Sequence, residues 1–275
     1  MRLSELLTTT VAIAHKAGEA ILDIYNRAEG FKVDIKSDAS PLTEADLAAH
    51  HVLVEGLEGL LDGVPVLSEE SEMPDYEVRR QWSRYWIVDP LDGTKEFVKR
   101  SGEFTVNIAL IEQGVPVLGV VYVPVSGVTY MGLQGEGAFK ECKGQRTSIS
   151  TRQVQPRIDQ DLTIDLVGSR SHGAQAVVDL LDRIAQQLGR VETKSMGSSL
   201  KLCLVAEGEA DLYPRLALTA EWDTAAAQAV VEAAGGCVID TDFKEMRYNT
   251  KEDILNPYFY VLGDPDFNWQ QVLTS

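Results

Sequence analysis

The stretch Trp86-Ile-Val-Asp89-Pro90-Leu91-Asp92-Gly93-Thr94 is the most informative part of this chain. An apolar run typical of a buried strand leads directly into two aspartates, which repel each other unless a cation or proton lies between them. Mg²⁺ prefers oxygen ligands, so a few carboxylates and a substrate phosphate can hold it. Gly93 permits close approach of an anion, and the short helix expected over residues 95–100 would present free N–H groups to phosphate. The stretch therefore predicts metal-assisted phosphate chemistry, although aspartates are also common in simple turns.

The composition limits the kind of partner. The 275 residues include 25 Lys and Arg against 42 Asp and Glu, which gives a net charge of −17. This acidity disfavours binding to nucleic acid or to a bare anionic membrane. A phosphate substrate would require divalent cations to offset the repulsion, but many soluble proteins are equally acidic. The length is sufficient for a large core, in one domain or in two closely packed halves.

Cysteine content and hydropathy indicate a cytoplasmic protein. Cys142, Cys203 and Cys237 are far apart and form no C-x-x-C pair, so we expect reduced thiols. The N-terminus does not resemble a signal peptide, and no segment approaches the roughly 20 apolar residues of a membrane span.

Apolar spacing predicts the elements of the first half. Leu7, Val11 and four later apolar residues recur at steps of three and four, which predicts a helix over residues 4–25. We expect a second helix ending near residue 61, strands at 64–67 and 85–88, and a strand-rich region over 104–130. The glycine-rich residues 132–137 are interpreted as a hairpin, since no helix follows as a nucleotide-binding loop would require.

The second half alternates between strands and helices. We expect strands at 163–167, near 191, at 211–213 and at 237–240, and helices at 174–188, 198–207 and 223–234. The two patterns predict a layered α/β (α+β) fold, with an N-terminal half over 1–145 and a C-terminal half over 146–275. The best boundary lies between residues 142 and 160.

Three further acidic residues are candidates for the same site, and each has a simpler explanation. Glu69 follows a short strand, but Ser-Glu-Glu-Ser segments are usually solvated loops, and Glu70 is an alternative ligand. Asp223 begins a helix, where aspartate is most often a cap. Asp46 stands in a Thr43-x-x-Asp46 pattern typical of a capping box. The histidines have no zinc-site spacing, and no nucleophile motif is present.

Two segments together resemble the inositol monophosphatase superfamily of magnesium-dependent, lithium-sensitive phosphatases. They are Trp86-Ile-Val-Asp-Pro-Leu-Asp-Gly-Thr-Lys-Glu-Phe97 and Trp222-Asp-Thr-Ala-Ala-Ala-Gln-Ala-Val-Val-Glu-Ala-Ala-Gly-Gly236, with Ser68-Glu69-Glu70 upstream. The resemblance spans nearly the whole chain and implies an αβαβα sandwich. It also implies that two or three Mg²⁺ are bound by Glu69, Asp89, Asp92, Asp223 and the carbonyl of Leu91. Thr94 and Asp46, assisted by Glu69, would then orient the attacking water.

Shorter segments resemble the branch of 3′(2′),5′-bisphosphate nucleotidases of bacterial sulfate assimilation. They are Lys95-Glu-Phe97, Gly168-Ser-Arg-Ser-His172, Ser198-Ser-Leu-Lys201 and Asp211-Leu-Tyr-Pro-Arg215. The resemblance implies hydrolysis of the 3′-phosphate of adenosine 3′,5′-bisphosphate (PAP) to AMP, with its sulfated form PAPS as a second candidate. The implied substrate-binding residues are Glu69, Leu91, Asp92, Gly93, Thr94, His172, Ser198, Lys201, Arg215 and Asp223.

Two alternatives remain open at this point. One is a phosphatase of the same superfamily that acts on inositol phosphate or a sugar bisphosphate, and the other is a sensor that binds Mg²⁺ and nucleotide without turnover. The resemblance also allows peripheral association with the cytoplasmic face of the inner membrane, which no basic amphipathic helix supports. The sequence does not set the oligomeric state.

Overall fold

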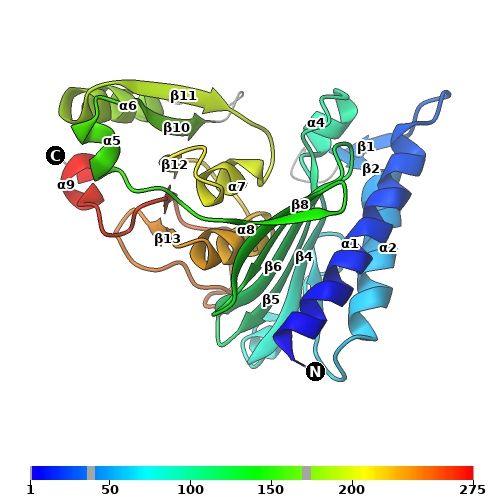
Figure 1. Ribbon diagram of the computed structural model, residues 1–275. Helices are drawn as coiled ribbons and strands as arrows, with labels where there is room; N and C mark the ends of the chain where they lie inside the picture. Colours follow the sequence, from blue (N-terminus) through cyan, green and yellow to red (C-terminus); the bar gives the residue numbers. More distant parts are fainter. Residues whose placement is uncertain (1, 36–40, 169–174, 275) are drawn as a thin grey trace.

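Helices and sheets alternate in five layers. The computed structural model describes residues 2–35, 41–168 and 175–274. Helices α1 (Leu3–Tyr25) and α2 (Glu44–Glu58) cover one face of a seven-stranded sheet, and α7 (Leu200–Ala206) and α8 (Glu221–Ala233) cover the other (Figure 1). A five-stranded sheet follows, and α6 (Gln175–Leu188) and α9 (Trp269–Thr274) cover its outer face. This order confirms the αβαβα sandwich.

The seven-stranded sheet is antiparallel except at one edge. Its order is β3-β4-β5-β6-β7-β8-β9, and only β3 and β4 run parallel among these neighbours. The bounds are β3 (Val66–Ser68), β4 (Arg84–Asp92), β5 (Thr105–Glu112), β6 (Val115–Val123), β7 (Val128–Leu133), β8 (Gly137–Cys142) and β9 (Gln145–Ile149). The hairpin expected at residues 132–137 is confirmed, since β7 and β8 pair there.

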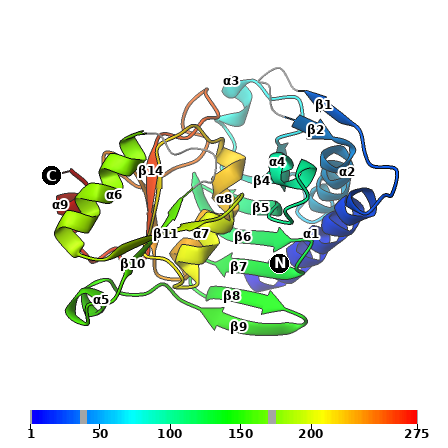
Figure 2. The same ribbon diagram turned by 90° about the horizontal axis from the view of Figure 1, so that it is seen from above.

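The five-stranded sheet mixes parallel and antiparallel pairs in the order β11-β10-β12-β14-β13. Its strands are β10 (Ile164–Gly168), β11 (Val191–Ser195), β12 (Leu212–Arg215), β13 (Cys237–Asp240) and β14 (Phe259–Leu262). The outer helices are α5 (Gln155–Asp159), α6 (Gln175–Leu188) and α9 (Trp269–Thr274), and Figure 2 shows them on the side away from α1 and α2. The sequence did not predict β14, α5 or α9, because short apolar runs carry little periodicity.

Four small elements complete the described chain. Strands β1 (Val33–Ile35) and β2 (Pro41–Thr43) form an antiparallel pair before α2, while α3 (Tyr76–Arg79) and α4 (Thr94–Val98) flank β4. No helix among the described residues is both long and apolar enough to cross a bilayer. The division near residue 145 stays a prediction. The chain leaves the first sheet only after β9, and one buried core contains residues from both halves.

Helix α8 lies directly on the first sheet because two glycines leave room for its backbone. Gly119 of β6 and Gly132 of β7 are cross-strand partners beneath α8. A Cβ atom added at Gly119 would lie 2.1 Å from the carbonyl oxygen of Ala226, and one at Gly132 would lie 2.4 Å from that of Ala229. The alanine-rich side of α8 and these glycines therefore bring the helix, with Asp223 in its first turn, close to the sheet.

We expect Gly119→Ala to lower the free energy of unfolding by about 1–3 kcal/mol, because the methyl group would force α8 away from the sheet. Urea denaturation measures this change. The control is Gly59→Ala, where the nearest atom to the added Cβ would be 3.7 Å away and the φ angle is negative. Equal stability of both variants would contradict the packing argument.

Candidate active site

Glu69 and Asp89 lie side by side because β3 and β4 run parallel. Ser68 and Val88 are register partners at the ends of these strands, and each acidic residue follows its partner by one position. The Glu69 N–H donates to the Val88 carbonyl oxygen at 3.2 Å, which continues the ladder by one step. Two acidic residues twenty positions apart in the sequence therefore meet at one edge of the sheet.

A β-bulge directs Asp92 toward the same region. Residues three apart in a regular strand point to opposite faces of the sheet. Here Asp89 pairs with Asn107 and Asp92 pairs with Thr105, so β4 has one more residue than β5 over this interval. An extra residue of this kind bends the strand and redirects its side chains. The Asp-x-x-Asp spacing thus suits a bulge with both carboxylates on one side.

Asp223 reaches this edge from the other half of the chain. It lies in the first turn of α8. Glu69, Asp89 and Asp223 each offer one carboxylate oxygen, and these three oxygens lie within 4.8 Å of one another. Asp223 also caps its helix, because its Oδ2 accepts a hydrogen bond from the Ala220 N–H at 2.9 Å. Asp223 therefore caps α8 and also belongs to the acidic cluster.

The cluster is electrostatically strained without a cation. Burial raises the pKa of Asp89 well above its usual range, and the charges of Glu69, Asp92 and Asp223 raise it further. Burial and the charges of Asp92 and Glu69 likewise raise the pKa of Asp223. Asp92 stands outside the tightest trio but acts on both pKa values. Hard carboxylate oxygens gathered in this way suit a cation such as Mg²⁺.

Thr94 and Asp46 meet beside the cluster. The Thr94 hydroxyl is 3.3 Å from Asp46 Oδ1 and 3.3 Å from the Leu91 carbonyl oxygen. Asp46 also forms the predicted capping box, since its Oδ2 accepts from the N–H and hydroxyl of Thr43 at 2.7 and 2.6 Å. One carboxylate serves both interactions. A 3.3 Å O–H···O distance is long, and such contacts often shorten when substrate is bound.

Cationic residues from the second half of the chain lie close enough to the acidic cluster to interact with it electrostatically. The buried Lys201 donates from Nζ to the Ser198 carbonyl oxygen at 2.6 Å and lies 5.7 Å from the centre of the Tyr213 ring. Burial lowers the pKa of Lys201, Arg215 lowers it further, and Asp92, Glu96 and Asp223 oppose this change. Lys201 is therefore close enough to the acidic cluster and to Arg215 for both to act on its charge. His172 lies outside the described residues.

Two buried polar atoms in this region have no hydrogen-bond partner among the described residues. Ser198 Oγ and Arg215 Nε are both buried, and no described residue bonds to either. Ser198 also has a φ of 45°, an unfavourable value for a residue other than glycine. Gly93 lies opposite, since an added Cβ there would be 3.4 Å from Ser198 Cβ. Unpaired buried polar groups require an explanation, and a bound polar ligand supplies one.

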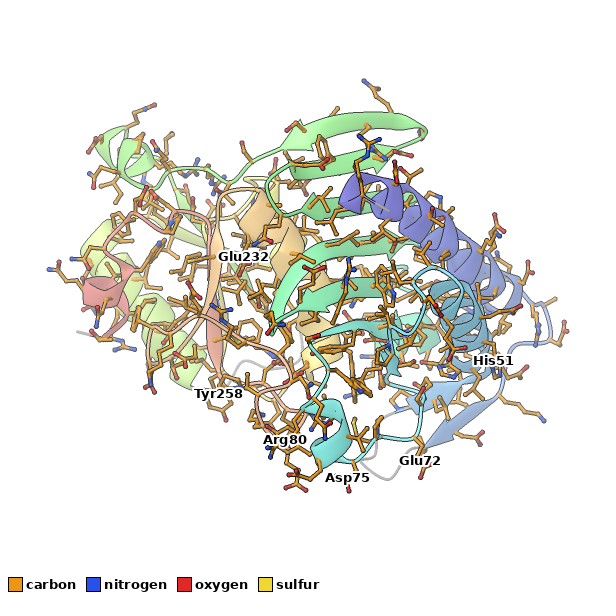
Figure 3. All side chains as sticks on the ribbon, turned by 90° about the horizontal axis from the view of Figure 1, so that it is seen from below. His51, Glu72, Asp75, Arg80, Glu232 and Tyr258 are labelled. Carbon is orange, nitrogen blue, oxygen red and sulfur yellow. The ribbon has the colours of Figure 1, made fainter. Side chains whose placement is uncertain are left out.

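A short helix fixes the segment that follows Glu69. The buried Arg79 of α3 donates from Nη1 to Asn249 Oδ1 at 2.6 Å, and from Nη2 to the Lys251 carbonyl oxygen at 3.0 Å. Asp75 and Arg80, the residues that flank α3, are labelled at the edge of the molecule in Figure 3. The Asn249 N–H donates to both oxygens of Glu221 at 3.0 and 2.9 Å. This chain of contacts connects the Glu69 loop to the start of α8.

Sequence reasoning missed the residues that hold Asp92. The Ser199 N–H and hydroxyl each lie 2.6 Å from Asp92 Oδ2, and the Asn107 amide nitrogen lies 3.4 Å from the same oxygen. The available signal was the alternation of polar Thr105 and Asn107 with apolar residues in a buried strand.

An acidic cluster beside a Thr–Asp pair, between the layers of an αβαβα sandwich, is the arrangement of a metal-dependent phosphatase. The inositol monophosphatase family profile matches residues 2–262, and the chain belongs to this family. It is 50% identical over 256 residues to the 3′(2′),5′-bisphosphate nucleotidase CysQ of Salmonella typhimurium, covering 93% of this chain and 99% of the relative.

Solved structures agree with this assignment. The crystal structure of CysQ from Bacteroides thetaiotaomicron superimposes with a TM-score of 0.81 at 45% identity, over 95% of this chain and 98% of that one. The extragenic suppressor protein SuhB from Bartonella henselae gives a TM-score of 0.76 at 26% identity, over 98% and 99% of the two chains.

We expect Asp89→Asn to raise the melting temperature of the metal-free protein and to abolish the increase caused by Mg²⁺. The amide removes one buried acidic group that is costly to ionise beside Glu69, Asp92 and Asp223, and it also removes a predicted cation ligand. Mg²⁺ at 100 times its Kd would stabilise the wild type by about 2.7 kcal/mol. Calorimetry in EDTA and in MgCl₂ measures both effects, with exposed Asp62→Asn as the control. An unchanged Mg²⁺ response in Asp89→Asn would exclude this carboxylate as a ligand.

Proposed function

We propose that this protein is a Mg²⁺-dependent phosphatase that hydrolyses the 3′-phosphate of adenosine 3′,5′-bisphosphate, giving AMP and phosphate. The observation that carries the proposal is that an acidic cluster and the buried, basic Lys201 occur in one site, where Asp92, Asp223 and Arg215 all act on the lysine charge. A bisphosphate has two anionic groups, and the site offers a cation-binding region for one and basic side chains for the other. Relatives that match almost the whole chain bear the name 3′(2′),5′-bisphosphate nucleotidase.

The proposed cation ligands are the carboxylates of Glu69, Asp89, Asp92 and Asp223 and the carbonyl oxygen of Leu91. An all-oxygen donor set fits Mg²⁺, and two or three ions are proposed. Bound Mg²⁺ lowers the pKa of water and offsets the negative charge on phosphoryl oxygens.

The proposed roles of Thr94 and Asp46 follow from their contact. The Thr94 oxygen accepts a proton from the attacking water while its own proton passes to Asp46, so the pair orients the water and takes up its proton. Glu69, at the end of β3, would help to orient the same water. The new P–O bond forms as the bond to the ribose 3′ oxygen breaks, and that oxygen takes a proton from solvent.

The proposed nucleotide contacts begin at Ser198, which lies beside Gly93. The Ser198 hydroxyl and Arg215 Nε, which have no partner in the part of the chain that the structure describes, would bond to the adenosine or the second phosphate, and Lys201 would contribute charge. His172 is proposed on the resemblance alone. PAPS, which has the same 3′-phosphate, is proposed as a second substrate, with a role in sulfate assimilation. Inhibition by Li⁺ is expected, whereas peripheral membrane association stays a prediction without support here.

The test of the proposal is a substrate panel with purified protein. We expect PAP to give the highest kcat/KM, with activity that requires Mg²⁺. A higher value for inositol 1-phosphate or a sugar bisphosphate would indicate another phosphatase of the family. Absence of phosphate release from every substrate would indicate a binding protein.

We expect Asp92→Asn to reduce kcat by several orders of magnitude with little change in stability. The asparagine oxygen can accept the hydrogen bonds from Ser199, and its NH₂ group would then occupy the position of the second carboxylate oxygen, where it cannot bind a cation. Steady-state rates at saturating Mg²⁺ and thermal unfolding measure both effects. Near-normal turnover would rule out the proposed role of Asp92.

Lys201→Met should raise KM for PAP by about ten- to a hundredfold, the value of one charge-assisted contact. Methionine nearly preserves the length and burial of the side chain while removing its charge. Parallel assays with inositol 1-phosphate provide the control, since this substrate has no second phosphate and should be little affected. An equal loss on both substrates would show that Lys201 has no role in specificity.

A further inference from the structure

Ser199 connects two acidic residues from distant parts of the chain. It is 2% exposed and lies directly before α7. Its N–H and its hydroxyl both lie 2.6 Å from Asp92 Oδ2, and the hydroxyl oxygen is 2.7 Å from the Asp223 carbonyl oxygen. Ser199 thus touches the end of β4 and the first turn of α8 at the same time.

The orientation of the Ser199 hydroxyl is constrained from β5. The Asn107 amide donates to Ser199 Oγ at 2.8 Å, and the Thr105 hydroxyl is 3.0 Å from Asn107 Oδ1. With its carbonyl oxygen accepting from Thr105, Asn107 directs its NH₂ group toward Ser199. The hydroxyl has one proton and two acceptors, and the charged Asp92 is the stronger one.

The hydrogen bonds that Asp92 accepts from the described residues involve only one of its two carboxylate oxygens. The donors among the described residues are the N–H and hydroxyl of Ser199 and the amide of Asn107, and all of them approach Oδ2. Oδ1 receives none from these residues, so its lone pairs remain for a cation. Residues that orient a metal ligand in this way commonly contribute tenfold or more to metal affinity.

We infer that Ser199 is a positioning residue for the cation site: with Asn107 it holds Asp92 so that Oδ1 remains available to the cation, and it fixes Asp92 relative to Asp223. The inference rests on the proposed function, in which Asp92 is a cation ligand. The neighbouring backbone supports it. The Gly197 N–H donates to Glu103 Oε2 at 2.9 Å, and an added Cβ at Gly197 would lie 2.9 Å from the Glu103 carbonyl oxygen. The segment before Ser199 is therefore held against the first half of the chain.

The test is the Kd of Mg²⁺ for Ser199→Ala, measured by isothermal titration calorimetry on the full chain. The variant keeps the N–H bond to Asp92 and loses the hydroxyl, and we expect Kd to rise by about ten- to a hundredfold. At saturating Mg²⁺, KM for PAP should stay close to the wild-type value. The control is Ser148→Ala on the exposed strand β9, which should match the wild type in every measurement.

A purely structural role predicts a different result. It would lower the melting temperature in EDTA and reduce activity at all Mg²⁺ concentrations, while the Kd of Mg²⁺ stayed at the wild-type value. That result would overturn the inference. If Ser199→Ala does not fold, the Kd of Mg²⁺ is measured for Asn107→Ala instead. Loss of the supporting amide should also raise this Kd, and an unchanged Kd would overturn the inference. If both variants fold, the double variant should bind Mg²⁺ little worse than Ser199→Ala alone, since the two residues act on one oxygen.

Failure of the inference can be separated from failure of the proposed function. If the wild type hydrolyses PAP and the Kd of Mg²⁺ is unchanged in Ser199→Ala, only the inference is rejected. Mg²⁺ binding that depends on Ser199 in a protein without PAP hydrolysis would reject only the proposed substrate. A wild type that binds no Mg²⁺ would reject both.

Discussion

Mutual repulsion among closely spaced carboxylates is the constraint on which the rest of this structure depends. Glu69, Asp89 and Asp223 offer ligand oxygens within 4.8 Å of one another, and Asp92 adds its charge beside them. The fold holds this arrangement because three of the aspartates each use one carboxylate oxygen in a hydrogen bond to the protein. Asp223 Oδ2 caps α8, Asp92 Oδ2 accepts from Ser199, and Asp89 Oδ1 accepts from the Leu91 N–H at 3.0 Å. The protein's own hydrogen bonds therefore set the positions of these carboxylates before a cation binds.

The sequence predicted the layers, and the structure brings three of the acidic residues that it named within 4.8 Å of one another. Local patterns were sufficient for α1, whose six apolar positions named by periodicity are all buried, and for the alternating second half. The interpretations of Asp46 and Asp223 as caps or as site residues were not exclusive, because a carboxylate has two oxygens. A local motif and a distant contact can therefore both be correct for the same residue.

What the sequence did not predict depends on tertiary pairing. The parallel register of β3 and β4 brings Glu69 beside Asp89, and the bulge in β4 turns Asp92 toward them, but neither is visible in residue spacing. Ser199 and Asn107 were missed because their partners lie far along the chain. The strand β14 was missed because four apolar residues are too few for a period to appear.

The place of α8 between the sheets has a consequence during synthesis. The seven strands of the first sheet are complete at Ile149, but the helix that covers their inner face ends only at Ala233. The nascent chain leaves the ribosome with that apolar face uncovered, and exposed surfaces of this kind favour aggregation. Chaperone binding to the growing polypeptide would protect the face until α8 docks on its two glycines.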